Sequence, residues 1–143
     1  MDRFMLKSAV HIFLMIDNKI LLLRRFNTGY EDGNYSVPAG HLDGNEPVTL
    51  AAIREVYEEC GVTIRPADLQ VVGVMHRKSR DERIDFFLAS TRWAGEIANS
   101  EPNKCDELRW CSLDGLPYNT IPYIRSAIQN YLAGTWFSEY GWS

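Results

Sequence analysis

Residues 46–60 constrain the fold more than any other part of the chain, because their apolar side chains recur at helical spacing. One side of the expected helix is formed by small or aliphatic residues, namely Val48, Ala51, Ala52, Val56 and Cys60. Asn45 can cap this helix, Pro47 suits its first turn and Gly61 suits its end. The sequence therefore predicts a helix that packs one face against a core.

The segments around this helix predict strands and one further helix. Apolar, β-branched runs over 9–16 and 20–23 flank a short polar turn and indicate a strand pair. Further strands are expected at 69–75, 84–90 and 107–110, with a charged turn at 78–83. A second helix is expected over 121–132, closed by Gly134. This order predicts one α/β (α+β) domain over residues 1–143, with a mixed sheet flanked by helices.

Composition excludes several classes of protein. A formal net charge of −4 argues against stable nucleic-acid binding through a basic surface. The apolar run 9–16 is too short to span a membrane, and residues 1–7 lack the pattern of a signal peptide. The three cysteines, Cys60, Cys105 and Cys111, form no CxxC pair, which favours reduced thiols. We therefore expect a cytoplasmic protein that binds no membrane.

Three glutamates of the first helix carry the strongest chemical pattern. Glu55, Glu58 and Glu59 stand at i, i+3 and i+4, which places their carboxylates on one helix face. Such a face is often only solvated, and like charges at this spacing repel. Arg54 can orient one acid, however, and the glycine-containing turn expected at 40–44 lets backbone approach a metal or phosphate closely. The pattern therefore favours a site for Mg²⁺, with Mn²⁺ as the alternative.

Residues 40–62, GHLDGNEPVTLAAIREVYEECGV, resemble the signature of the Nudix hydrolase superfamily at every defined position. The resemblance implies the Nudix fold, an α/β/α sandwich around a mixed sheet, and hydrolysis of a nucleoside diphosphate linked to another group. It also implies that Glu55, Glu58 and Glu59 bind metal together with the carbonyl of Gly40. Arg54 and Glu46 are implied as residues that orient these ligands.

Outside this segment the chain is similar to the MutT-like branch of the superfamily. Arg24 and Arg25 stand where that branch carries an arginine pair, which can clamp a substrate phosphate. Glu101 falls where relatives supply a further metal-binding or basic carboxylate. Asn119 falls, with Thr120 beside it, in the loop that reads the base in MutT, so Asn119 is a candidate for substrate binding without fixing which base is bound.

The resemblance implies a concrete reaction. A bound divalent ion neutralises the diphosphate and acidifies a water, and either Glu55 or Glu101 takes its proton. Glu58, Glu59 and Arg54 complete the expected catalytic group, and His41 can touch a phosphate. The expected substrate is a (d)NTP, which gives a (d)NMP and pyrophosphate. The alternatives are hydrolysis of a nucleotide sugar or ADP-ribose, or a Nudix-fold nucleotide sensor without catalysis.

Several aromatic and imidazole side chains have no assigned role. Phe26, Tyr35, Phe86 and Trp110 are candidates for stacking on a base, whereas His11 and His76 are expected to be structural or rim residues. The aromatic tail 135–143 can pack on its own domain, form a homodimer interface or cover the site. The sequence does not choose among these three.

Overall fold

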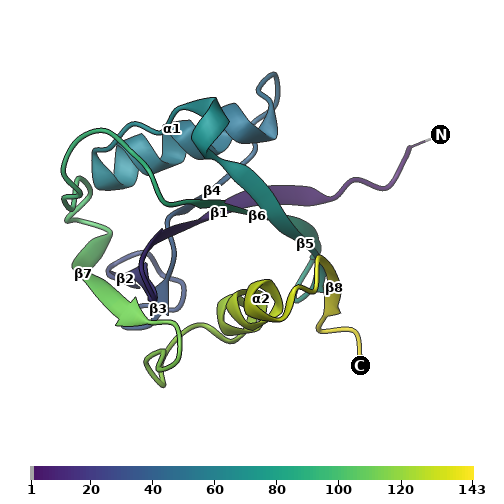
Figure 1. Ribbon diagram of the computed structural model, residues 1–143. Helices are drawn as coiled ribbons and strands as arrows, with labels where there is room; N and C mark the ends of the chain where they lie inside the picture. Colours follow the sequence, from purple (N-terminus) through teal and green to yellow (C-terminus); the bar gives the residue numbers. More distant parts are fainter. Residues whose placement is uncertain (1) are drawn as a thin grey trace.

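A computed structural model describes residues 2–143; Met1, the first residue of the predicted domain, lies outside the described residues. The described chain forms two α-helices, α1 (Val48–Cys60) and α2 (Pro122–Ala133), and a 3-10 turn, η1 (Pro66–Asp68) (Figure 1). Its strands are β1 (Lys7–Ile16), β2 (Lys19–Arg25), β3 (Tyr35–Ser36), β4 (Ala39–His41), β5 (Gln70–Lys78), β6 (Glu82–Ser90), β7 (Cys105–Ser112) and β8 (Phe137–Tyr140).

The strands form one mixed sheet in the order β3-β2-β1-β6-β5-β8, with β4 also paired to β1 and β7 also paired to β2. Two of the pairings are parallel, β1 with β6 and β5 with β8, and the other strand pairs are antiparallel. The central position of β1 explains its burial, since it has neighbours on both sides and helices above and below (Figure 1). The predicted mixed α+β architecture is confirmed.

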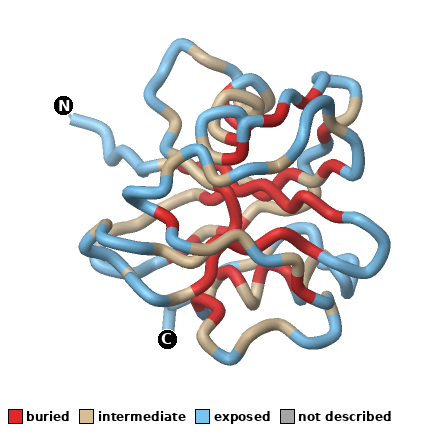
Figure 2. The backbone as a smooth tube through the Cα atoms, turned by 90° about the vertical axis from the view of Figure 1, so that its left-hand side faces the viewer, coloured by how far each residue is buried: buried red, intermediate tan, exposed pale blue. Residues whose placement is uncertain are grey.

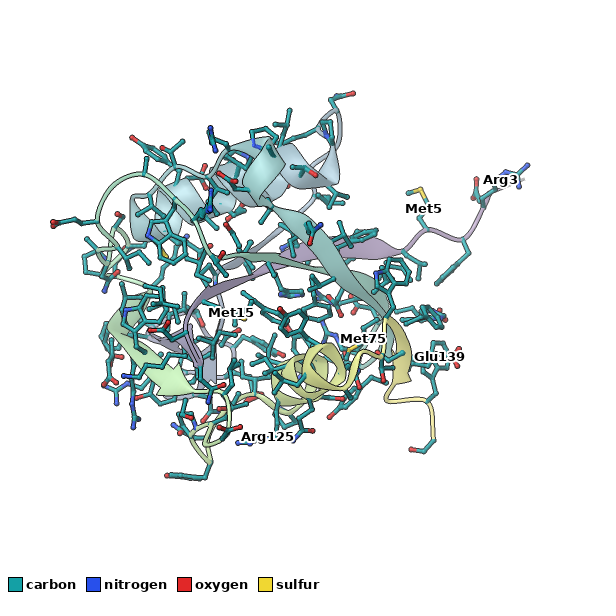
Figure 3. All side chains as sticks on the ribbon, in the orientation of Figure 1. Arg3, Met5, Met15, Met75, Arg125 and Glu139 are labelled. Atoms are coloured by element: carbon teal, nitrogen blue, oxygen red, sulfur yellow. The ribbon has the colours of Figure 1, made fainter. Side chains whose placement is uncertain are left out.

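Each helix covers one face of the sheet, and the alternation of β1 supplies both cores. Val10, Ile12 and Leu14 are fully buried on the α1 side, whereas Phe13 and Met15 face α2. The buried stretches accordingly follow the middle of the sheet in Figure 2. In Figure 3, Met15 and Met75 point into the layer between the sheet and α2, while Arg3 and Met5 project from the N-terminal segment.

Helix α1 begins two residues later than predicted. Pro47 is its N-cap residue, and no side chain caps it by a hydrogen bond, so the predicted cap by Asn45 is wrong. Asn45 instead has a φ of 60°, a left-handed conformation that asparagine tolerates in turns. The prediction of a turn over 40–44 is also wrong at its start, because Gly40 lies within the short strand β4. The first helix therefore enters from a strand followed by a loop.

The aromatic tail packs on its own sheet. β8 pairs in parallel with β5, from Val74 opposite Phe137 to Arg77 opposite Tyr140. Trp142 links the end of the tail to β5, because its Nε1 donates a hydrogen bond to the His76 carbonyl at 3.0 Å. No helix within residues 2–143 is long and apolar enough to cross a membrane.

Candidate active site

A hollow of about 940 Å³ opens where β4, the C-terminal half of α1 and the β5–β6 hairpin meet. This volume suits a nucleotide-sized ligand. Its walls include acidic, basic and aromatic side chains, among them Arg25, Tyr30, Gly40, His41, Glu55, Glu58, Glu59, Arg77, Arg83, Glu101, Lys104 and Tyr123.

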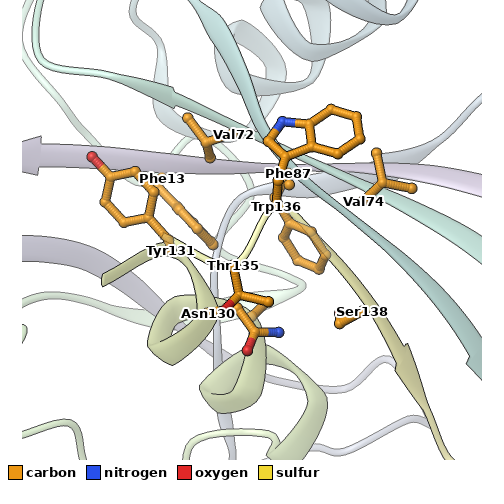
Figure 4. Close-up of a pocket in the computed structure, with 11 residues that line it drawn as sticks. Phe13, Val72, Val74, Phe87, Asn130, Tyr131, Thr135, Trp136 and Ser138 are labelled. Atoms are coloured by element: carbon orange, nitrogen blue, oxygen red, sulfur yellow. The ribbon is translucent and has the colours of Figure 1, made fainter. Parts of the chain in front are cut away.

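A second hollow lies beside the tail, between Phe13, Val72, Tyr131 and Trp136 (Figure 4). Its volume of about 10 Å³ is no more than one water molecule occupies. The larger hollow is therefore the candidate active site.

The acidic end of this hollow is built by α1 against β4. The amide of Ala39 donates a hydrogen bond to Glu59 Oε2 at 3.1 Å, which ties the helix to the strand. Glu55, one helical turn before Glu59, lies so close to Gly40 that a Cβ at Gly40 would overlap its carboxyl group. A side chain at residue 40 would therefore displace the Glu55 carboxyl group, and the backbone of Gly40 lies beside the acids.

Arg54 organises the neighbouring carboxylates. Its Nη1 lies 2.8 Å from Glu55 Oε1 and 3.5 Å from Glu58 Oε2, and its Nη2 lies 2.9 Å from Glu46 Oε1. The hydrogen bonds from Arg54 hold the pKa of Glu46 below its ordinary value. Arg54 and Glu46 therefore form an ion pair at the edge of the acidic end, from which Arg54 reaches Glu55 and Glu58.

The two inner carboxyl groups resist ionisation. Burial raises the pKa of Glu55, and the charges of Glu58 and Glu101 raise it further against the opposing effect of Arg54. Burial also raises the pKa of Glu59 well above its ordinary range, and Glu55 and Glu101 add to the effect. The ionised forms of these neighbouring carboxyl groups repel one another, so a bound cation would stabilise them.

Glu101 joins this end from the turn before β7. Its amide donates a hydrogen bond to Asn99 Oδ1 at 3.1 Å, and Lys104 Nζ lies 4.0 Å from its Oε2. Glu101 lines the same hollow as Glu55, Glu58 and Glu59, although it lies more than 40 residues away from them in the sequence. The fold therefore brings together all four candidate carboxylates.

These acids fit a divalent cation by their chemistry. No three Asp, Glu, His or Cys side chains in the described part of the chain converge closely enough to hold an ion as they stand. Arg54 contacts both Glu55 and Glu58 and partly offsets their negative charge. Carboxylate and carbonyl oxygens are the ligands that Mg²⁺ and Mn²⁺ prefer, and a cation would favour the ionised forms of Glu55 and Glu59.

Basic side chains line the remainder of the hollow. Arg25 donates from Nε to the Tyr30 carbonyl at 2.7 Å and from Nη2 to Thr28 Oγ1 at 3.1 Å, so the loop after β2 fixes its position. His41 lies at the rim, with Nε2 3.1 Å from Arg83 Nη1. Arg25 and His41 are therefore the predicted substrate-binding residues that lie in the hollow.

Two predicted substrate-binding residues lie elsewhere. Arg24 donates from Nε to Asp106 Oδ1 at 2.7 Å, and Asn119 donates from Nδ2 to the Gly33 carbonyl at 2.8 Å. Neither lines the hollow, because alternate residues of β2 face opposite sides and the Asn119 side chain bonds to the Gly33 backbone. The structure thus separates Arg24 from Arg25, which the sequence had paired.

Pattern reading missed the basic and aromatic residues that complete the walls, namely Tyr30, Arg77, Arg80, Arg83, Lys104 and Tyr123. The charged turn at 78–83 was a usable indication, since a hairpin rich in arginine next to an acidic helix suggests anion binding. The aromatic candidates Phe26, Tyr35, Phe86 and Trp110 do not line the hollow.

Comparison with known proteins shows that the chain belongs to the Nudix family. The model of the NUDIX domain matches residues 5–131. The chain is 37% identical over 112 residues to a protein of Methanocaldococcus jannaschii named ADP-ribose pyrophosphatase, which covers 76% of this chain and 63% of that protein. The chain thus spans slightly less than two thirds of that relative's length.

Two further comparisons cover more of each protein. A Bacillus subtilis protein named putative 8-oxo-dGTP diphosphatase is 30% identical over 129 residues, which are 90% of this chain and 80% of that one. A crystal structure titled MutT NUDIX hydrolase from Burkholderia pseudomallei superimposes with a TM-score of 0.80 at 25% identity, over 88% of this chain and 98% of that chain.

Proposed function

Because this chain belongs to the Nudix hydrolases, in their MutT-like branch, and thus to the enzymes that act on phosphorus-containing anhydrides, we propose that it cleaves (d)NTPs to (d)NMPs and pyrophosphate. One observation carries the proposal: the carboxylates of Glu55, Glu58, Glu59 and Glu101 line one end of a nucleotide-sized hollow, next to the backbone of Gly40. Basic side chains line the remaining walls, which suits a polyphosphate.

The acidic end would hold the cation, Mg²⁺ or Mn²⁺, through Glu55, Glu58, Glu59 and Glu101 with the Gly40 carbonyl. The cation supplies neutralisation of the diphosphate charge and acidification of the attacking water. Arg54 and Glu46 orient these acids. Arg54 contacts Glu55 and Glu58 directly and so partly offsets their negative charge.

Two carboxylates are placed to accept the proton of the attacking water. Glu55 is enclosed between Gly40 and Arg54, whereas Glu101 stands on a turn, where Lys104 Nζ lies 4.0 Å from its carboxylate. A group that must take up and release a proton benefits from such freedom, so we favour Glu101 as general base, with Glu55 as the alternative.

Arg25 and His41 bind the phosphates. Arg25 is held by Tyr30 and Thr28 in the wall of the hollow, and its planar guanidinium can donate two hydrogen bonds to one phosphate. His41 follows Gly40 directly, so a phosphate beside the acids also meets its imidazole. Phosphoryl transfer depends chiefly on such positioning and charge stabilisation.

A second substrate deserves a test because of one relative. The Methanocaldococcus jannaschii protein is named ADP-ribose pyrophosphatase, and it is the most identical of the relatives described above. The hollow of about 940 Å³ is large enough for a nucleoside diphosphate that carries a second sugar. ADP-ribose would yield AMP and ribose 5-phosphate, without pyrophosphate.

The experiment is a panel of dNTPs, NTPs, ADP-ribose and nucleotide sugars, each incubated with the purified chain and Mg²⁺. Pyrophosphate, orthophosphate and phosphatase-sensitive phosphomonoesters are measured separately. The proposal expects pyrophosphate without orthophosphate from at least one triphosphate. Phosphomonoesters from ADP-ribose alone would select the second substrate, and no cleavage anywhere would leave a nucleotide sensor.

The cellular compartment, the oligomeric state and the kind of binding partner are proposed from features outside the site. Cys60, Cys105 and Cys111 are free, buried thiols, and burial raises the pKa of each, which suits a reducing cytoplasm. A homodimer stays a prediction, and the exposed side chains of Trp136 and Phe137, at the start of β8, form the surface it would use. The net charge of −4 supports a small nucleotide, rather than a nucleic acid, as the binding partner.

A further inference from the structure

A buried polar group forms part of the wall of the candidate active site, from residues that no step above uses. His11 Nε2 lies 3.0 Å from Asp85 Oδ1, and Arg77 donates from Nε to Asp85 Oδ2 at 2.7 Å. Asp85 is fully buried, and His11 and Arg77 are only 3% and 6% exposed. His11 and Arg77 line the same hollow as the glutamates of α1.

The contacts fix which imidazole nitrogen carries the proton. Burial acts to raise the pKa of Asp85, but the hydrogen bonds and charges of His11 and Arg77 lower it below its ordinary value. Asp85 is therefore a carboxylate that can only accept hydrogen bonds, so Nε2 of His11 must donate to it. In the neutral imidazole, Nδ1 is then an acceptor.

Nδ1 of His11 lacks a hydrogen-bond partner. Among the residues that the structure describes, it is the one buried side-chain nitrogen or oxygen atom that makes no hydrogen bond. Buried polar atoms are nearly always paired, because an unpaired one is costly. The ring is held rigidly, stacked on Phe87 at 4.8 Å between centroids and edge-on to Tyr123 at 5.7 Å. A fixed acceptor beside a ligand-sized hollow points to a ligand that donates to it.

Arg77 provides the complementary donor. Its guanidinium lies over the ring of Tyr123, 3.7 Å from the centroid, and it bonds to Asp85 through Nε and Nη2. The Nη1 N–H groups are thus left for a ligand. Tyr30 also lines the hollow and is half exposed, so a planar group can lie against it.

We propose that His11 and Arg77 are specificity-determining residues that bind the base of the nucleotide, with His11 Nδ1 accepting from a base N–H and Arg77 donating to the adjacent carbonyl or ring nitrogen. The inference rests on the function proposed above and names the part of the substrate that this wall binds.

The chemistry selects a base over the other parts of a nucleotide. Ionised phosphate oxygens only accept hydrogen bonds, so they cannot pair with Nδ1 as an acceptor. A nucleobase presents a donor and an acceptor side by side on a planar edge, and aromatic rings and guanidinium planes stack on such planes. A ribose hydroxyl can also donate to Nδ1, and the test below separates that case.

The direct test follows the imidazole nitrogens of the wild-type chain by ¹⁵N NMR. The chain has three histidines, and the spectrum of His11→Phe assigns the residue of interest. GMP, AMP, UMP and CMP are titrated separately, with ribose 5-phosphate as the control that lacks a base. The proposal expects the Nδ1 resonance of His11 to move with at least one nucleotide and to stay unchanged with ribose 5-phosphate. An Nδ1 that none of the four moves, or that ribose 5-phosphate moves equally, overturns it.

A kinetic test uses the same variant. Phenylalanine keeps a flat ring on Phe87 but removes both the Nδ1 acceptor and the Nε2 donor to Asp85, so His11→Phe should raise KM for the nucleotide about 3- to 10-fold with little change in kcat. Unchanged KM in a folded His11→Phe overturns the inference. Failure of the proposed function differs from both outcomes, because wild-type chain would then hydrolyse no nucleotide while the NMR titration still reports binding.

Discussion

Gly40 illustrates how one residue serves the site by lacking a side chain. An added Cβ would overlap the Glu55 carboxyl group, although the backbone of β4 itself requires no glycine there. Gly40→Ala should therefore displace Glu55 and lower kcat/KM roughly 10- to 100-fold, the range typical when a metal ligand loses its support. Gly115→Ala is the matched control, because nothing lies within 4 Å of the added carbon. Equal activities of the two variants would refute this role of Gly40.

Adjacent arginines allow a second comparison at the residue scale. Arg25 lies in the wall of the hollow, whereas Arg24 is bonded to Asp106. Arg25→Ala should raise KM about 10-fold or more, since a charged hydrogen bond to a phosphate is lost. Arg24→Ala should change KM less than twofold, as measured with the best substrate of the panel. A larger increase in KM for Arg24→Ala than for Arg25→Ala would assign the phosphate contact to Arg24 instead.

Asp85 makes stability depend on acidity. Its pKa is lower in the folded chain than its ordinary value, so its contribution is complete above the ordinary pKa of about 4 and is lost as pH falls through the lowered folded value. Asp85→Asn should cost about 3–5 kcal/mol at neutral pH, because it leaves Arg77 buried without its carboxylate. Urea unfolding from pH 7 to pH 3 measures both. The difference in free energy of unfolding between wild type and Asp85→Asn should become smaller as the pH falls. A difference that does not change with pH would contradict a contribution from the ionised Asp85 carboxylate.

At the scale of elements, α1 and β8 show what sequence patterns do and do not predict. The periodic apolar face of α1 and the continuous apolar, β-branched run of β1 were sufficient to predict both elements, since burial of those residues dictates them. β8 was not predicted, because its strand character comes from pairing with β5 rather than from an alternation of its own. The cap of α1 was misplaced because asparagine suits both an N-cap and the left-handed turn position that Asn45 occupies.

The tail also yields a prediction at this scale. The ring of Trp142 lies tilted against that of His76, with 4.7 Å between centroids, and Trp142 donates a hydrogen bond to the His76 backbone. Trp142→Ala should therefore lower the free energy of unfolding by about 1–2 kcal/mol and speed amide hydrogen exchange along β5. Trp142→Phe keeps a ring and should lose only part of this. Unchanged exchange in both variants would mean that the tail does not hold the sheet edge.

Across the whole molecule, the candidate site is assembled from segments distant in sequence. The acids of α1 were predictable because their spacing lies within one helix, and a signature covers them. Glu101 was predictable only through the family resemblance. The wall of His11, Arg77 and Tyr123 depends on β1, β5 and α2 meeting across the sheet, so no local pattern reports it. Long-range packing therefore supplies the part of the site that no sequence pattern predicts.

The central claim is that the carboxylates of α1 bind a cation and cleave a phosphorus anhydride. The most direct measurement is pyrophosphate release from the best triphosphate at increasing Mg²⁺, for wild type, Glu58→Gln and the exposed control Glu96→Gln. The claim predicts metal-dependent release by wild type and Glu96→Gln. It also predicts a fall of roughly 100-fold or more in kcat for Glu58→Gln, because one charged ligand is lost at unchanged size. Release that needs no metal, or that Glu58→Gln leaves unchanged, would contradict it.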